Sequence, residues 1–199
     1  MKDRHYYNEL TSILTRSFTP TGYTLTKAIE LDPIPESVKY NGLIFSLNEQ
    51  KIIYRRGKIT TNRPGAFLAI WRRPFPACTV SNKPIPFKSN ELDYLFVQVE
   101  EELTTANGKI LNSKPKSGFF IFPVSLLMKH GIVISEKAKG KTGFRVFPPW
   151  SQDRGDVGTK VFSASAKKTQ RWQLPYFIEI NDDGLIDSNQ LNKIFEPNN

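Results

Sequence analysis

Three short and almost uninterrupted apolar segments constrain the fold of this chain more than any other feature. They are Ala66–Arg73, which is apolar up to its two terminal arginines, Asp93–Val99 and Gly118–Phe122. A strand that is covered on both faces has this pattern, because neither side of it meets solvent. The segments therefore predict central strands of a sheet that is flanked by other elements.

Helix and hairpin patterns precede and separate these segments. Apolar residues recur at three- and four-residue spacing from Tyr6 to Phe18, which predicts a leading helix that ends at Pro20. Leu43–Leu47 and Lys51–Arg56 flank a short polar loop and predict a hairpin. The other predicted elements are helices at Pro123–His130, Ser163–Trp172 and Ser188–Phe195, and strands at Ile132–Ile134, Phe144–Phe147 and Tyr176–Ile180.

This order predicts a mixed α/β fold in one domain over residues 1–199. Residues 1–40 would form a helical N-terminal part, and residues 41–199 a sheet core with a basic C-terminal helix and a short closing helix. The chain has one cysteine, Cys78, so no internal disulfide can form. No secretory signal is visible and no segment is long enough to span a bilayer, so we expect a cytoplasmic protein without membrane insertion.

The basic residues are segregated along the chain. Lys and Arg total 28 against 19 Asp and Glu, a net charge of +9. Residues 51–88 hold nine basic residues and no acid, and residues 137–172 hold nine against two acids. Charge of this size favours an anionic partner such as nucleic acid. The alternative is a soluble protein that is basic for no functional reason.

The element order also resembles the helix–strand–strand–strand–helix–strand core of PD-(D/E)XK nucleases. The segments that would form this core are the leading helix, Ala66–Arg73, Asp93–Val99, Gly118–Phe122, Pro123–His130 and Ile132–Ile134. That chemistry needs an acid at the start of the second strand and an acid-x-Lys on the third, to hold a divalent metal. Asp93 stands where the first acid belongs, but Gly118–Phe122 offers neither acid nor lysine. Asp93 is then either a vestigial metal ligand or simply a polar strand start, and we favour the second. No metal, no cofactor and no nuclease activity are expected.

Basic side chains and tryptophans occur together in both basic segments. Arginine suits phosphate groups, and a tryptophan ring can stack on an unpaired base. This combination predicts binding of single-stranded DNA or RNA in preference to duplex DNA; the alternative is that the tryptophans only pack in the core. The candidate contacts are Arg55, Arg56, Arg72, Arg73, Arg145, Trp150, Lys167, Lys168, Arg171 and Trp172.

Several blocks of the sequence occur in an order typical of one family: Tyr54–Thr60, Ala66–Pro74, Asp93–Val97, Phe120–Leu127, Gly143–Ser151 and Ala166–Phe177. Over roughly residues 40–180, these blocks resemble the MepB family. The resemblance implies a distant relation to PD-(D/E)XK endonucleases, contact with nucleic acid, and association with a multidrug efflux operon. It leaves two rival functions: an active metal-dependent nuclease, and a small-molecule binder accessory to efflux. A site for a cationic drug would need carboxylates beside its aromatic rings, which the positive net charge disfavours.

Overall fold

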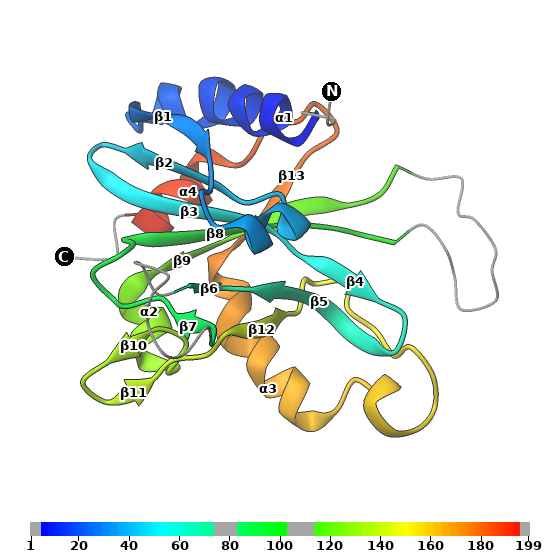
Figure 1. The fold of residues 1–199 in the computed structure, drawn as a ribbon. Coiled ribbons are helices and arrows are strands. Elements are labelled where there is room, and N and C mark those ends of the chain that lie inside the picture. Colours follow the sequence, from blue (N-terminus) through cyan, green and yellow to red (C-terminus); the bar gives the residue numbers. More distant parts are fainter. Residues whose placement is uncertain (1–4, 74–82, 103–113, 196–199) are drawn as a thin grey trace.

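A mixed sheet of six strands lies at the centre of the computed structural model, which describes residues 5–73, 83–102 and 114–195 (Figure 1). The strand order is β1-β2-β3-β8-β9-β13. Their bounds are β1 Leu25–Leu31, β2 Leu43–Leu47, β3 Gln50–Arg56, β8 Tyr94–Glu100, β9 Ser117–Pro123 and β13 Phe177–Ile180. Strands β3 and β8 are parallel, and the other neighbours are antiparallel. The fold is therefore mixed α/β.

The predicted strands at Asp93–Val99 and Gly118–Phe122 are confirmed as β8 and β9. Strand β8 is buried at every position but its last, and β9 at every position between its first and last residues. They pair in register with Val97 opposite Phe120, as their apolar sequences require of strands covered on both sides. The predicted hairpin is also confirmed, with β2 and β3 joined by a two-residue turn. Asn48 and Glu49 of this turn have φ of 44° and 66°, the left-handed pair that a type I′ hairpin turn needs.

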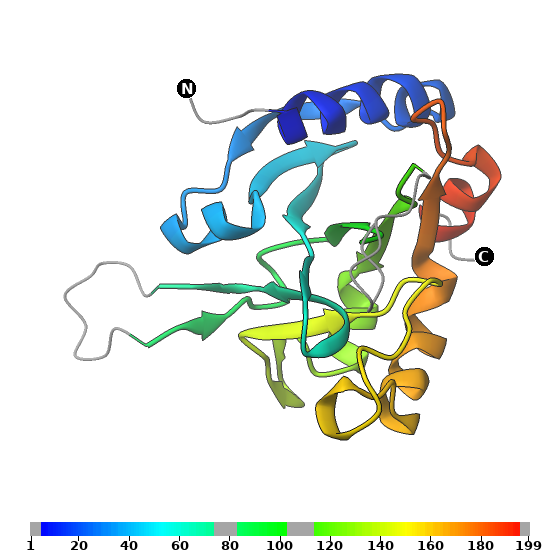
Figure 2. The same ribbon diagram turned by 90° about the vertical axis from the view of Figure 1, so that its right-hand side faces the viewer.

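Helices cover one face of the sheet (Figure 2). They are α1 (His5–Ile13), which continues as a π-helical segment over Leu14–Phe18 and a 3-10 turn over Thr19–Thr21, and α4 (Ser188–Phe195). Both predicted helices are confirmed. Phe18 and Phe195 meet Phe96 of β8, with ring centroids 5.8 and 6.2 Å away. Burial of such aromatic and aliphatic side chains holds this layer on the sheet.

A second layer covers the other face. It contains a three-stranded sheet, two short ribbons and two helices. The bounds are β4 Lys58–Thr60, β5 Arg63–Ala69, β6 Trp71–Arg72, β7 Ile85–Pro86, β10 Ile134–Ser135, β11 Ala138–Lys139, β12 Gly143–Val146, α2 Val124–Lys129 and α3 Ala164–Gln173, with 3-10 turns at Pro35–Tyr40, Gly158–Lys160 and Leu174–Tyr176. The core of this layer joins β5 and α2 to β8 and β9.

Three predicted features are wrong. Ala66–Arg73 does not join the six-stranded sheet and is not covered on both faces, because β5 lies between β4 and β12 in a separate three-stranded sheet and buries only alternate residues. Ile132–Ile134 does not add to the central sheet, because β10 pairs with β11 in a short hairpin and its Ile134 bridges Lys88, which also lies outside that sheet. Residues 1–40 are not purely helical, since β1 forms an edge of the sheet. Two strands that the sequence assigned to the nuclease-like core therefore lie outside the six-stranded sheet.

Within the described part of the chain, no helix has the length and apolar character that a membrane span requires.

Candidate nucleic-acid interface

The structure removes Arg55 from the predicted phosphate contacts. Its side chain is 1% exposed and forms an ion pair with Asp32, which is 2% exposed. The same guanidinium donates to the Tyr54 carbonyl oxygen at 2.8 Å. A buried charge needs such partners because its desolvation cost is large. Arg55 is a core residue, and the prediction that it contacts phosphate is wrong.

Three further predicted contacts, Arg56, Arg72 and Arg73, are partly exposed but already paired with carboxylates. Arg56 pairs with Glu100, the last residue of β8.

Arg72 Nε lies 2.6 Å from Glu91 Oε1, and Arg73 Nε donates to Glu36 Oε1 at 2.6 Å. Arg73 also lies over the Trp71 ring, with its Cζ 5.2 Å from the centroid. Residues 89–102, which hold five acids and no basic residue, thus supply partners to Arg56 and Arg72 and lower the positive potential there.

Arg145 braces the turn between β4 and β5. Its Nη2 donates to Thr60 Oγ1 at 2.8 Å, and its Nη1 donates to the Pro64 carbonyl oxygen at 3.2 Å. Burial, and secondarily the neighbouring Arg63, lowers the pKa of Arg145. Its donors are largely used inside the protein, although no carboxylate neutralises its charge among the described residues.

Helix α3 presents the predicted basic residues to solvent. Ser163 begins the helix as an N-cap, its Oγ accepting from the Ala166 N–H at 3.2 Å. Lys167, Lys168 and Arg171 are exposed. In the described ranges, none of the three has a carboxylate within ion-pair distance.

Trp172 connects α3 to the end of α2 through an aromatic stack. Its ring centroid lies 3.9 Å from that of His130, with 12° between the planes. It also contacts Phe122, with ring centroids 5.7 Å apart and 48° between the planes. Both stacked residues remain partly exposed. Trp172 therefore packs against two rings and also remains partly open to solvent.

Two lysines that sequence analysis did not select, Lys129 and Lys141, lie near the stacked His130. Burial lowers the pKa of His130, and the charges of Lys129 and Lys141 lower it further. These lysines are exposed and, like those of α3, form no ion pair in the described part of the chain. Lys141 lies in the basic loop after β11, and only the fold brings that loop to α2.

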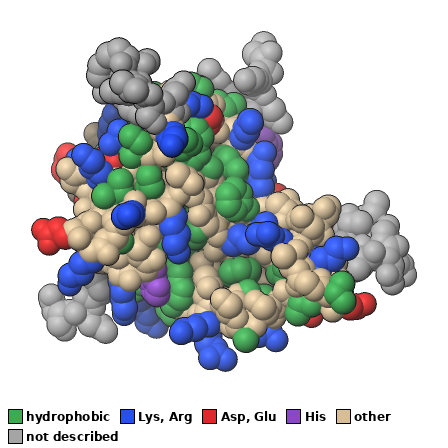
Figure 3. All heavy atoms as spheres, turned by 60° about the horizontal axis from the view of Figure 1, so that its bottom comes forward, with side chains coloured by type: hydrophobic (Ala, Val, Ile, Leu, Met, Phe, Trp, Pro, Cys, Tyr) green, Lys and Arg blue, Asp and Glu red, His purple; other side chains and the backbone are tan. Residues whose placement is uncertain are grey.

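We call this region the α2–α3 surface. It consists of Lys129, His130, Lys141, Lys167, Lys168, Arg171 and Trp172. Figure 3 views the molecule from this side, and basic side chains are spread across it while acidic ones lie mostly at its margins. A cationic surface with a partly exposed aromatic stack can attract phosphates and contact a base.

Trp150 lies elsewhere. Its ring packs edge-on against Phe177 at 5.5 Å. It also lines a recess together with Glu100, Glu101 and Glu102. Glu100 and Glu102 pair with Arg56 and Arg154, and Glu101 adds a carboxylate without an ion pair in the described ranges. The described lining of the recess therefore offers a phosphate backbone no unpaired cation, which disfavours the predicted stacking role for Trp150.

Asp93, which immediately precedes β8, forms hydrogen bonds with the backbone of neighbouring elements. Its Oδ2 accepts from the Lys51 N–H at 2.7 Å, and its own N–H donates to the Lys51 carbonyl oxygen at 2.8 Å. Its carbonyl oxygen accepts from Val124 N–H at 2.8 Å, where α2 begins. These bonds account for a polar residue at this position. Among the described residues, no group of three or more His, Cys, Asp or Glu side chains could hold a metal.

Comparisons with known proteins give one family and one related structure. A family model described as MepB-like matches residues 35–179. The solved structure titled "Crystal Structure of MepB" is similar with a TM-score of 0.58 and 27% sequence identity, over 89% of this chain and 97% of that chain. A search of the curated proteins gives no match.

Proposed function

The chain belongs to the MepB-like family, and from this premise and the α2–α3 surface we propose that it binds nucleic acid, single-stranded DNA or RNA in preference to duplex DNA. The observation that carries the proposal is that five cations, unpaired in the described part of the chain, share one surface with a partly exposed aromatic stack. Arg56, Arg72 and Arg73 have carboxylate partners. The cations of the α2–α3 surface have none in the described ranges.

Unpaired surface cations favour a polyanion for a physical reason. Lysines and an arginine gathered on one face repel one another, and phosphate groups relieve that repulsion. Each neutralised phosphate also releases condensed counterions, which drives association at low salt. Cations that already have carboxylate partners gain less, because the new contact must replace an existing one.

The preference for single strands depends on Trp172 and His130. Bases in a duplex are already stacked on one another, so a surface aromatic pair cannot reach their faces. An unpaired base can lie against the exposed part of the stack, a contact of about 1–3 kcal/mol in comparable proteins. Lys168 precedes Trp172 by one helical turn and would hold the adjoining phosphate.

The relation to PD-(D/E)XK nucleases stays part of the proposal. It is supported by the succession of β8, β9 and α2 with Asp93 at the start of β8. The position of β5 and β10 outside the central sheet does not support it. We expect no cleavage of plasmid or single-stranded RNA with Mg²⁺ or Mn²⁺; cleavage that an Asp93→Ala variant loses would favour the nuclease alternative. A cytoplasmic location and an association with efflux also stay predictions.

Fluorescence anisotropy with labelled oligothymidylate, oligouridylate and a duplex of equal length tests the proposal. We expect the double variant Lys168→Ala/Arg171→Ala to bind every oligonucleotide more weakly. Its salt slope should fall by about 1.4, twice the value of roughly 0.7 per phosphate contact on a single strand.

The matched control is Lys116→Ala/Lys193→Ala. It removes the same charge from two exposed lysines outside the α2–α3 surface. Lys116 immediately precedes β9, and Lys193 lies in α4. The control should keep the wild-type slope. Equal losses in both double variants would mean that only net charge matters and would contradict a contact at α2–α3.

A further inference from the structure

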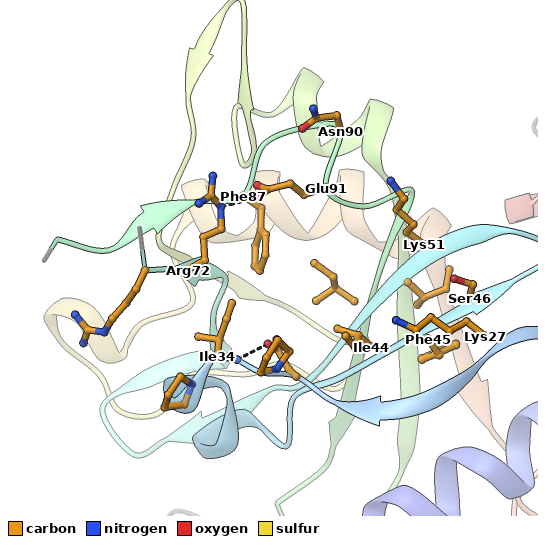
Figure 4. A pocket seen from close by; sticks show the side chains of 16 residues that line it. Lys27, Ile34, Ile44, Phe45, Ser46, Lys51, Arg72, Phe87, Asn90 and Glu91 are labelled. Atoms are coloured by element: carbon orange, nitrogen blue, oxygen red, sulfur yellow. Dashed lines mark hydrogen bonds and ion pairs between the residues drawn. The ribbon is translucent and has the colours of Figure 1, made fainter. Parts of the chain in front are cut away.

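A large cavity lies apart from the α2–α3 surface, between the sheet and the β6–β7 ribbon (Figure 4). Its volume is about 910 Å³, within the range of small-molecule sites. Strands β1, β2 and β3 form one side, and Arg72 and the segment from Phe87 to Glu91 form the other. No residue of the α2–α3 surface lines it.

The interior of the cavity is apolar. Phe87 points into it from the ribbon side, opposite Ile34 and Ile44 (Figure 4). Ile53 of β3 also lines it and is 6% exposed, whereas Ile34 and Ile44 are half-buried. When an apolar ligand covers apolar side chains that are partly open to solvent, the burial of that surface stabilises the complex.

The acidic groups of the lining are neutralised by arginines. Asp32 pairs with the buried Arg55, and Glu91 pairs with Arg72. Arg73, which also lines the cavity, is paired with Glu36. These pairs leave little net charge in the part of the cavity between Ile34 and Arg72.

Two lysines set the charge at the other end. Lys27 of β1 and Lys51 of β3 line that end on either side of Ser46 of β2, which is opposite both in the sheet register (Figure 4). Lys51 forms no ion pair in the described part of the chain. Lys27 lies 3.4 Å from Glu30, a pair in which both side chains are about half exposed and which is therefore weak. This end of the cavity is cationic.

We propose that this cavity binds a small amphiphilic anion: an aliphatic or aromatic body with one acidic group. The body would cover the half-buried Ile34 and Ile44 and lie against Phe87 and Ile53, which are 7% and 6% exposed, and the acidic group would lie between Lys27 and Lys51. Both features are needed, because an apolar wall alone selects no charge and lysines alone select no body. A cationic drug fits poorly, since both carboxylates of the lining already have arginine partners.

Isothermal titration with three ligands of equal chain length tests the charge selectivity. The ligands are decanoate, decanol and decyltrimethylammonium, each below its micelle concentration. We expect saturable binding of one decanoate per chain, about three- to tenfold tighter than decanol, as two partly exposed ion pairs allow. Decyltrimethylammonium should bind most weakly. Cationic binding as tight as that of decanoate would overturn the proposal, as would the lack of saturable decanoate binding.

Two double variants locate the site. Lys27→Gln/Lys51→Gln should bind decanoate and decanol equally, while Lys167→Gln/Lys168→Gln removes the same charge and should keep the selectivity. Unchanged selectivity in the first variant would place the anion elsewhere and refute the site.

Oligonucleotide binding separates this proposal from the proposed function. Lys27→Gln/Lys51→Gln should leave it unchanged, and Lys167→Gln/Lys168→Gln should weaken it. Competition between decanoate and oligonucleotide for one site would contradict a separate cavity.

Discussion

At the residue scale, two adjacent arginines differ in burial: Arg55 is enclosed with Asp32, whereas Arg56 stays partly exposed. Arg55 and Arg56 are adjacent on β3, so their side chains point to opposite faces of the sheet. One is enclosed with Asp32 and the other reaches Glu100. The sequence does not reveal which arginine is enclosed, because the buried partner lies in a distant loop.

Replacing Asp32 should destabilise the protein strongly. In Asp32→Asn the Arg55 charge remains buried without a carboxylate, which costs about 3–5 kcal/mol in comparable pairs. Urea unfolding followed by circular dichroism measures this loss. The matched variant Glu36→Gln breaks a more exposed pair with Arg73 and should cost at most about 1 kcal/mol. Similar values for the two variants would show that burial does not set the strength of these pairs.

At the scale of elements, the sequence predicts helices and inner strands better than it predicts which sheet a strand joins. Strands β8 and β9 and helices α3 and α4 occur where their patterns place them. The apolar run of β5 gives no sign that it pairs with β4 and β12. Phe67 looks like a core residue, yet it lies on the outer side of β5 beneath Arg145, whose Cζ is 5.8 Å from the ring centroid. Strand β1 was missed because Lys27 and Glu30 interrupt its apolar pattern at an exposed sheet edge.

Part of the candidate site could likewise be predicted from the sequence, and part could not. Lys167, Lys168, Arg171 and Trp172 follow from helical spacing alone. The contribution of α2 could not be predicted, because only the fold stacks His130 on Trp172. A histidine at the end of a short helix carries no signal of such a contact in the sequence.

The junction of α2 and α3 should depend on pH through His130. Burial and two lysines hold its pKa below the ordinary 6.5 in the folded protein. The unfolded chain therefore binds the proton more readily, and the stability from neutral His130 is full above pH 6.5 and lost as pH falls through the lowered pKa. His130→Gln should show a smaller loss of stability over that window than the wild type. Identical pH profiles in thermal unfolding would contradict this assignment.

At the scale of the whole molecule, the charge segregation seen along the chain is reorganised by the fold. Acidic residues that follow the first basic segment form ion pairs with it: Glu91 pairs with Arg72, and Glu100 pairs with Arg56. Glu102 reaches Arg154 of the second segment. Several cations of the first segment are therefore partly neutralised, whereas the five cations of the α2–α3 surface have no ion pair in the described ranges.

The central claim is that nucleic acid contacts the α2–α3 surface, and the three tryptophans allow a direct measurement. Each indole N–H gives its own signal in a ¹H–¹⁵N spectrum of the protein, recorded as oligouridylate is added. We predict that the Trp172 signal shifts in a saturable and salt-sensitive way, while the Trp71 and Trp150 signals stay in place. Shifts confined to Trp71 or Trp150, or no shift at any indole under conditions of binding, would contradict the account.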